Sequence, residues 1–210
     1  MKSKSSREVS VIALLAALYA AASFLPISVY IGGEGFITAN VVILPLIAYV
    51  LDPLLAALTA GLGSIAMYAA GASITPIYGI MTPLVPLSGA LIGSLAKKSR
   101  FAAVPWMLFG IVSYLVWSGG TALWVLFYLV PMGTALIPHR WRGVQVLNVC
   151  AAASIAELVA MDLGSIFLLG FQGFLWLIIL PFAVYERAVA IVGSYLLVRV
   201  FDRYRARLFA

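Results

Sequence analysis

Charged residues are scarce in this chain of 210 residues. Only 10% of the residues are charged, whereas 64% are hydrophobic and the mean hydropathy is +1.12. An ordinary soluble domain has about 25% charged residues, so this composition excludes a water-soluble fold. At roughly 20 residues per crossing, the length allows about six to eight transmembrane helices and leaves no room for a separate soluble domain.

Cysteine and histidine each occur once. The single cysteine, Cys150, excludes an internal disulfide, a CxxC redox pair and a thiolate metal cluster. The single histidine, His139, stands beside Arg140 in a basic connection, which argues against a serine-histidine protease or a multi-histidine metal site. We expect Cys150 to be a packing residue and His139 a solvated loop residue. No metal and no cofactor is expected, and an enzyme would have to work with carboxylates alone.

Apolar segments separated by proline, glycine or basic residues fill the chain. The first runs from Val9 to Leu25, and a cleaved signal peptide is the alternative interpretation of it. The segments that follow are residues 38–51, 54–71, 78–96, 101–117, 120–137, 145–169 and 174–201. Segments 101–117 and 120–137 meet at a pair of glycines, so they are either two spans or one bent element. The predicted fold is all-α: a single polytopic transmembrane helix bundle over residues 1–210, with six to eight spans and eight as the best estimate.

The basic residues mark one side of the predicted bilayer. Every lysine and arginine except Arg187 lies at the termini or in alternate connections. The connections on the opposite side, which contain neither lysine nor arginine, are residues 26–37, 71–77, 118–119 and 170–173. Cytoplasmic connections are basic, so we expect both termini to be cytoplasmic in a multi-pass protein of the plasma membrane. The net charge of +6 therefore describes orientation and predicts no nucleic-acid partner.

Four charged residues fall inside the last two predicted spans: Glu157, Asp162, Glu186 and Arg187. Such residues cost several kcal/mol unless they are paired or hydrated, so they are functional candidates. A rise of about 1.5 Å per residue places Glu157 and the Glu186-Arg187 pair at a common depth. Arg187 either forms a structural ion pair with Glu157 or Asp162 or faces a ligand, and the adjacent Glu186 is expected to meet a different partner. These residues carry a local formal charge of −2, from three acids and one base, which favours a cationic or hydrogen-bond-rich ligand or a carboxyl that burial keeps neutral.

The outward connection at residues 26–37 contains three glycines and several recognition groups. We interpret it as a lid over an outward-facing site, with an ordinary flexible connector as the alternative. The residues expected to contact substrate in this connection, just after it and around the next outward connection are Tyr30, Glu34, Asn40, Tyr68 and Tyr78. Interfacial anchoring is the alternative role for the last two tyrosines.

Small residues recur at every fourth position of the first segment, at Ala13, Ala17 and Ala21. Such a stripe lets two helices approach closely in lipid. It either packs inside the bundle or docks a second membrane protein.

Four stretches of the chain have a familiar order: a basic start followed by VIALLAALYAAASFLPIS, then GGEGFITANVVILPLIAYVLDPLLAALTAGLGSIAMYAAG, TPIYGIMTPLVPLSGALIGSLAKKSR and LPFAVYERAVAIVGSYLLVRVF. In this order the chain resembles the substrate-binding S components of energy-coupling factor transporters, which import vitamins and related micronutrients. The resemblance covers about residues 8–100 and 150–201. It implies that Ala13, Ala17 and Ala21 contact a transmembrane coupling subunit, and that the loop at 26–37 closes a substrate site near the outer face.

Two departures from that family are visible. The family usually has six spans, so residues 101–137 resemble an inserted helical hairpin. The Met-His amino terminus of the nickel and cobalt members is absent, because Lys2 follows Met1. A metal substrate is therefore not expected.

The leading hypothesis is a membrane-embedded substrate-binding subunit for uptake of a small water-soluble vitamin or related micronutrient. It would work with a separate coupling protein and cytoplasmic ATPases, because the chain has no GxxxxGK(S/T) stretch of its own. The alternative is a stand-alone secondary transporter or channel driven by protons through Glu157, Asp162 and Glu186. An intramembrane enzyme with paired carboxylates is a third class, for which no nucleophile stands out.

Overall fold

The computed structural model describes residues 4–29, 36–71 and 79–208. Its helices are α1 (Lys4–Ala22), α2 (Asn40–Val50), α3 (Pro53–Ala69), α4 (Leu84–Lys98), α5 (Val104–Trp117), α6 (Val125–Leu136), α7 (Arg142–Phe167) and α8 (Leu175–Leu208). Two short 3-10 turns, η1 (Gly79–Met81) and η2 (Ala122–Trp124), precede α4 and α6. The described residues therefore confirm the predicted all-α fold, and each predicted apolar segment corresponds to one helix.

A small antiparallel pairing of β1 (Pro26–Val29) with β2 (Phe36–Thr38) was not predicted. These strands are the two ends of the connection that the sequence predicts to be a lid or, alternatively, a flexible connector, and residues 30–35 between them lie outside the described residues. Pro26 lies opposite Thr38 and Val29 lies opposite Phe36. The register of the pairing is irregular between Pro26 and Ser28. The two ends of the connection between α1 and α2 therefore lie side by side.

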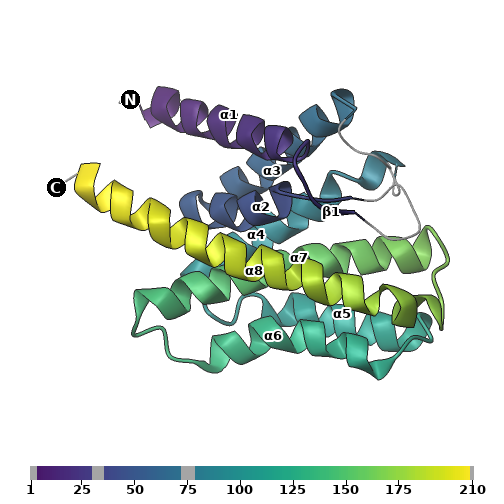
Figure 1. Ribbon diagram of the computed structural model, residues 1–210. Helices are drawn as coiled ribbons and strands as arrows, with labels where there is room; N and C mark the ends of the chain where they lie inside the picture. Colours follow the sequence, from purple (N-terminus) through teal and green to yellow (C-terminus); the bar gives the residue numbers. More distant parts are fainter. Residues whose placement is uncertain (1–3, 30–35, 72–78, 209–210) are drawn as a thin grey trace.

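The helix α7 runs through the middle of the molecule (Figure 1). It contacts α2, α4, α5, α6 and α8, and all its residues from Asn148 to Val159 are buried. Alanines dominate this stretch, so neighbouring helices can approach its backbone. Cys150 lies in it, with no exposed surface, as the expected packing residue.

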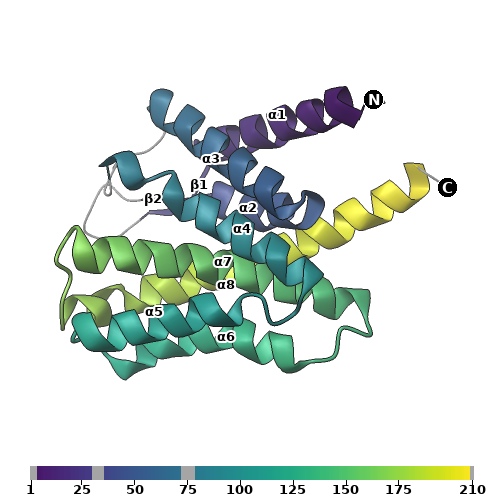
Figure 2. The same cartoon turned by 180° about the vertical axis from the view of Figure 1, so that it is seen from behind.

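Two groups of helices lie on opposite sides of α7 (Figures 1 and 2). On one side α1 packs on α2 and α3, and on the other side α5 and α6 form a hairpin against α7. Residues 101–137 are thus two helices rather than one bent element. Their connection turns at Gly119, whose φ of +58° is a left-handed conformation that favours glycine.

One end of the bundle gathers the basic connections. Arg142 at the start of α7 pairs with Asp202 near the end of α8 at 2.9 Å. Gln145 on α7 donates to the Lys97 carbonyl at the end of α4, at 3.2 Å. The start of α1 and the end of α8 lie at this same end (Figure 1). We call it the basic end.

The opposite end holds the glycine-containing turns, and we call it the glycine end. The Gly173 amide, before α8, donates to the Ser118 carbonyl, after α5, at 2.8 Å. The β1–β2 pairing lies toward this end as well (Figure 1). The described connections are therefore divided between the two ends as the charge pattern predicts.

Two of the described helices are long and apolar enough to cross a membrane: Arg142–Phe167 and Leu175–Tyr204. The other apolar helices are shorter. The 11 residues of α2 rise only about 16 Å, against about 30 Å of bilayer hydrocarbon. The eight predicted spans are thus present as helices, and the number that cross a membrane stays a prediction.

Candidate functional site

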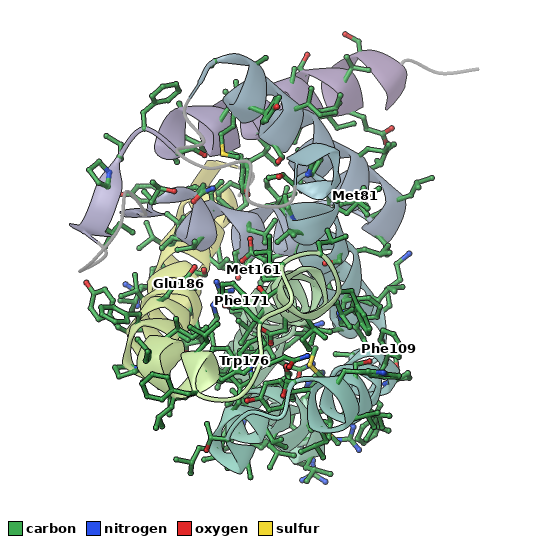
Figure 3. All side chains as sticks on the ribbon, turned by 90° about the vertical axis from the view of Figure 1, so that its right-hand side faces the viewer. Met81, Phe109, Met161, Phe171, Trp176 and Glu186 are labelled. Carbon is green, nitrogen blue, oxygen red and sulfur yellow. The ribbon has the colours of Figure 1, made fainter. Side chains whose placement is uncertain are left out.

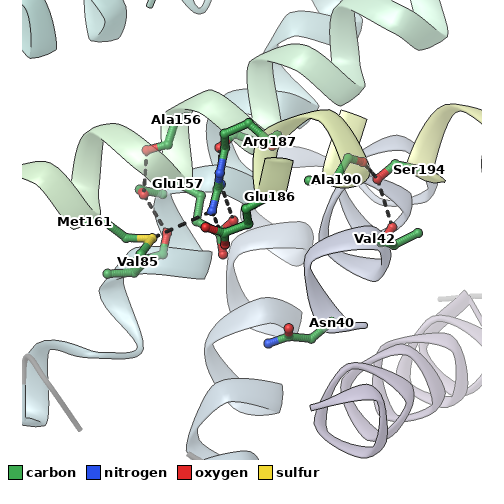
Figure 4. Close-up of polar contacts among 12 residues, drawn as sticks. Asn40, Val42, Val85, Ala156, Glu157, Met161, Glu186, Arg187, Ala190 and Ser194 are labelled. Carbon is green, nitrogen blue, oxygen red and sulfur yellow. Dashed lines mark hydrogen bonds and ion pairs between the residues drawn. The ribbon is translucent and has the colours of Figure 1, made fainter. Parts of the chain in front are cut away.

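The arginine predicted inside the last span lies at the centre of a buried polar group. Arg187 on α8 is 2% exposed. Its Nη1 atom donates to the Glu157 carboxylate at 3.0 Å and to the Ser154 carbonyl at 2.7 Å, both on α7. Its Nη2 atom donates to the Glu186 carboxylate and approaches the Met161 sulfur at 3.9 Å (Figure 4). We call these five residues the Arg187 group.

The predicted ion pair between Arg187 and Glu157 is therefore present. Glu186 does not share the partner of Arg187 on α7, but it contacts Arg187 itself, which was not predicted, so both acids meet one guanidinium. Successive residues on a helix point in different directions, but the long glutamate and arginine side chains bend toward each other here.

Helical spacing explains how α7 supplies its share of the Arg187 group. Ser154, Glu157 and Met161 follow one another at intervals of three and four residues, so they lie on one helix face. Glu157 lies about 15 Å from the last residue of α7, and Glu186 lies about 17 Å from the first residue of α8. The two helices are connected at the glycine end, so these acids share a depth, as predicted. Figure 3 shows Glu186 and Met161 among the helices near the middle of the end-on view.

The first three helices contribute further polar and sulfur-containing side chains. The buried Tyr19 of α1 interacts electrostatically with Asn40, Glu157 and Arg187. Asn40, at the start of α2, accepts a hydrogen bond from Thr38 at 2.6 Å, and its amide nitrogen lies 3.9 Å from the Met67 sulfur of α3. The predicted residue Asn40 thus lies near the Arg187 group, between the β1–β2 pairing and α3.

Four residues around the Arg187 group were not selected from the sequence: Tyr19, Met67, Ser154 and Met161. Tyr19 had a signal, because it is the one aromatic side chain among the alanines and leucines of α1. Ser154 and Met161 could have been found from their spacing to Glu157. Met67 carries no such signal, because methionine is common in apolar helices.

Unpartnered polar atoms occur around the same group. Among the described residues, five buried side-chain nitrogen or oxygen atoms have no hydrogen-bond partner. Two of them, Arg187 Nε and Ser154 Oγ, belong to the Arg187 group. Buried polar atoms are rarely left unpaired, so each needs an explanation. Here they mark a region that offers hydrogen bonds.

Asp162 takes part in a separate set of hydrogen bonds and does not belong to the Arg187 group. Five residues along an α-helix turn it about 140° away from Glu157. Its carboxylate accepts hydrogen bonds from Trp124 Nε1 at 2.9 Å and from the Tyr128 hydroxyl at 2.5 Å. These donors hold the α5–α6 hairpin to α7. The acids that meet at Arg187 are therefore two, and the formal charge there is −1 instead of the predicted −2.

The other predicted site residues lie elsewhere. Tyr68 is 51% exposed on the outer surface of α3 and is not brought to the Arg187 group. Tyr30, Glu34 and Tyr78 lie outside the described residues.

The alanine stripe of α1 lies on the surface. Ala13, Ala17 and Ala21 are exposed, whereas Ala16 is buried against α3. A Cβ added to Gly63 of α3 would come within 2.9 Å of the Ala16 carbonyl, so the two helices touch there. The helix therefore has one small-residue face that is used in packing and a second that is open.

Residues with metal-binding chemistry do not gather in the described part of the chain, where no three His, Cys, Asp or Glu side chains could hold an ion. His139, in the connection between α6 and α7, is far from the candidate site along the chain and only partly exposed. Burial lowers its pKa, and the charge of Arg100 lowers it further, so the imidazole is neutral at pH 7. The site that the structure assembles is a charged hydrogen-bonding group.

Comparison with known proteins adds no assignment. No protein-family model, no curated protein and no solved structure matches this chain.

Proposed function

We propose that this chain is the membrane-embedded substrate-binding subunit of an uptake system for a small water-soluble vitamin or related micronutrient. It works, in this proposal, as the S components of energy-coupling factor transporters do, with a separate coupling protein and cytoplasmic ATPases. The observation that carries the proposal is a charged, hydrogen-bonding group enclosed by helices whose outer surfaces are apolar.

The outer surface supports a multi-pass membrane protein. Large apolar side chains that are at least 40% exposed occur on α1, α3, α5, α6 and α8; examples are Leu14, Leu54, Val112, Leu126 and Val192. A soluble protein rarely exposes apolar patches of this extent. We propose a polytopic bundle in the plasma membrane with the basic end in the cytoplasm, since cytoplasmic connections are the basic ones.

The position of the Arg187 group supports binding from outside. Charged residues inside membrane segments usually face the bundle interior and mark pathways or binding sites. Asn40 lies two residues after β2, and the β1–β2 pairing lies toward the glycine end (Figure 1). In the proposed orientation the glycine end faces outward, and substrate reaches the Arg187 group from there.

The open stripe of α1 supports docking to another membrane protein. Ala13, Ala17 and Ala21 present a surface without bulky side chains, which lets a partner helix approach closely. The sequence has no phosphate-binding loop of the GxxxxGK(S/T) type, so energy would come from the partners.

The docking role is tested by co-purification with a candidate coupling subunit after the double substitution Ala13→Leu and Ala17→Leu. We expect loss of the complex while the free subunit keeps its melting temperature, because these side chains face outward. Ala188→Leu is the matched control, since Ala188 is an exposed alanine on α8. Unchanged assembly of the double variant would count against docking through α1.

The need for partners is tested by reconstitution. Liposomes that contain only this chain are expected to accumulate no substrate, and addition of the coupling subunit and ATPases is expected to start uptake. Proton-driven uptake by the chain alone would contradict the proposal and favour a secondary transporter.

A further inference from the structure

We infer that the Arg187 group binds a small organic cation whose nitrogen atoms carry N–H donors, such as an amidinium or a protonated amino-heteroaromatic ring. This inference rests on the proposed function, because it names the substrate class of the same site. It depends on the hydrogen-bond partners that the Arg187 guanidinium already has.

Arg187 has one donor left for a ligand. Its two terminal nitrogens already meet Glu157, Glu186, the Ser154 carbonyl and the Met161 sulfur, and only Nε has no partner. A single N–H suits a ring nitrogen or a carbonyl of the ligand, whereas a carboxylate that paired with the guanidinium through two N–H groups would have to displace one of the two glutamates from its partner. Breaking a buried ion pair in this way is strongly unfavourable.

The acids are the more accessible members of the group. The Glu186 side chain is 12% exposed and that of Glu157 is 8% exposed, against 2% for Arg187. Each carboxylate has two oxygens that together can accept several hydrogen bonds. The guanidinium donates to only one oxygen of each carboxylate. The groups that a ligand can reach are therefore negatively charged carboxylates that accept hydrogen bonds.

An unpartnered hydroxyl adds further acceptor sites. Ser154 Oγ, which has no partner, lies three residues before Glu157 and so on the same helix face as that acid. A hydroxyl has two acceptor lone pairs. This buried oxygen is independent of the acids and also suits a ligand that donates hydrogen bonds.

The remaining side chains suit an organic body rather than a bare metal ion. Tyr19, Met67 and Met161 provide an aromatic ring and two thioethers. Thioethers are adaptable, weakly polar groups that pack well against rings. A hard metal cation instead requires a shell of oxygen ligands, and no such set of acids is found among the described residues.

The test uses the purified full chain and three probes of nearly equal shape: benzamidinium, benzamide and benzoate. Calorimetric titration is expected to show that benzamidinium binds at least tenfold more tightly than benzamide, with no binding of benzoate. A preference for benzoate, equal affinity for the three probes or binding of none of them would overturn the inference.

Substitutions test whether benzamidinium binds at the Arg187 group. Glu186→Gln leaves Glu157 to pair with Arg187 and is expected to weaken benzamidinium binding at least tenfold. Asp162→Asn is the matched control, because it removes one buried carboxylate from the same bundle outside the Arg187 group, and it is expected to leave affinity unchanged. If Glu186→Gln does not fold, Glu186→Asp keeps the charge and is expected to keep the preference for the cation. Loss of the preference in Asp162→Asn alone would overturn the assignment to this group.

Native mass spectrometry of the chain purified from its own cells separates this inference from the proposed function. A retained organic cation would support both. A retained carboxylic acid would overturn the inference and leave uptake with partners standing. A preference for benzamidinium in a chain that never assembles with a coupling subunit would overturn the proposed function alone.

Discussion

Arg187 concentrates more buried charge around itself than any other described residue, because two acids share its guanidinium. We predict that Arg187→Met destabilises the protein by about 3–5 kcal/mol, since it leaves two buried carboxylates without a cation. Unfolding in mild detergent, followed by circular dichroism, measures the loss. Arg203→Met is the control, because Arg203 is exposed near the end of α8, and it should change stability little. Similar losses in the two variants would show that the ion pairs contribute nothing.

Asp162 provides a second prediction at the residue scale. Asp162→Asn changes the group that accepts both hydrogen bonds through Oδ2, so we expect a loss of about 1–3 kcal/mol in the free energy of unfolding. Tyr128→Phe removes one donor and should have an effect of the same sign. Because the two residues are in contact, the losses should not add in the double variant. Additive losses would contradict a shared interaction.

The polar contacts differ in how far the sequence can predict them. The pairing of Glu157 with Arg187 follows from depth, because both lie a similar number of residues from one connection. The separation of Asp162 follows from the helical repeat. Its donors, Trp124 and Tyr128, could not be predicted, because nothing in the sequence fixes the rotation of α6 relative to α7.

At the scale of whole elements, the closest helix contact joins α4 to α7. A Cβ added to Gly93 would come within 2.5 Å of the Ala153 Cβ and 3.0 Å of its Cα. We predict that Gly93→Ala separates the two helices and costs about 1–3 kcal/mol by overpacking. Chemical denaturation of the purified variant measures this cost.

The control for that substitution lies on another helix. A Cβ added to Gly133 of α6 would meet nothing within 4 Å. Gly133→Ala should therefore leave stability unchanged or raise it by up to about 1 kcal/mol through helix propensity. A loss at Gly133 as large as the loss at Gly93 would mean that helix propensity, and not the contact with Ala153, sets the cost.

The helices were predictable and the strands were not, for a physical reason. Apolar runs interrupted by proline, glycine and basic residues indicate where a helix begins and ends. The paired strands Pro26–Val29 and Phe36–Thr38 have four and three residues, which is too short for an alternation of polar and apolar side chains to be a reliable signal. Their pairing is also irregular, so local sequence gives it little support.

At the scale of the molecule, the two ends predict a topology that can be measured. A fluorescent protein fused after the last residue should be fluorescent in the cytoplasm, because α8 ends among the basic connections. A phosphatase inserted at Gln172, an exposed residue of the α7–α8 connection, should be active outside. The reverse pattern would place the basic end outside and would remove the proposed route for substrate.

The complete burial of Cys150 inside α7 has a practical consequence for such measurements. A thiol without exposed surface does not react with polar maleimides while the protein is folded, so the native chain behaves as a protein without cysteine. One cysteine introduced at the exposed Ala188 or Gln172 would then carry a label alone, with no need to replace Cys150. Distances between a pair of such labels can therefore be followed in an otherwise unaltered protein as ligand and partners are added.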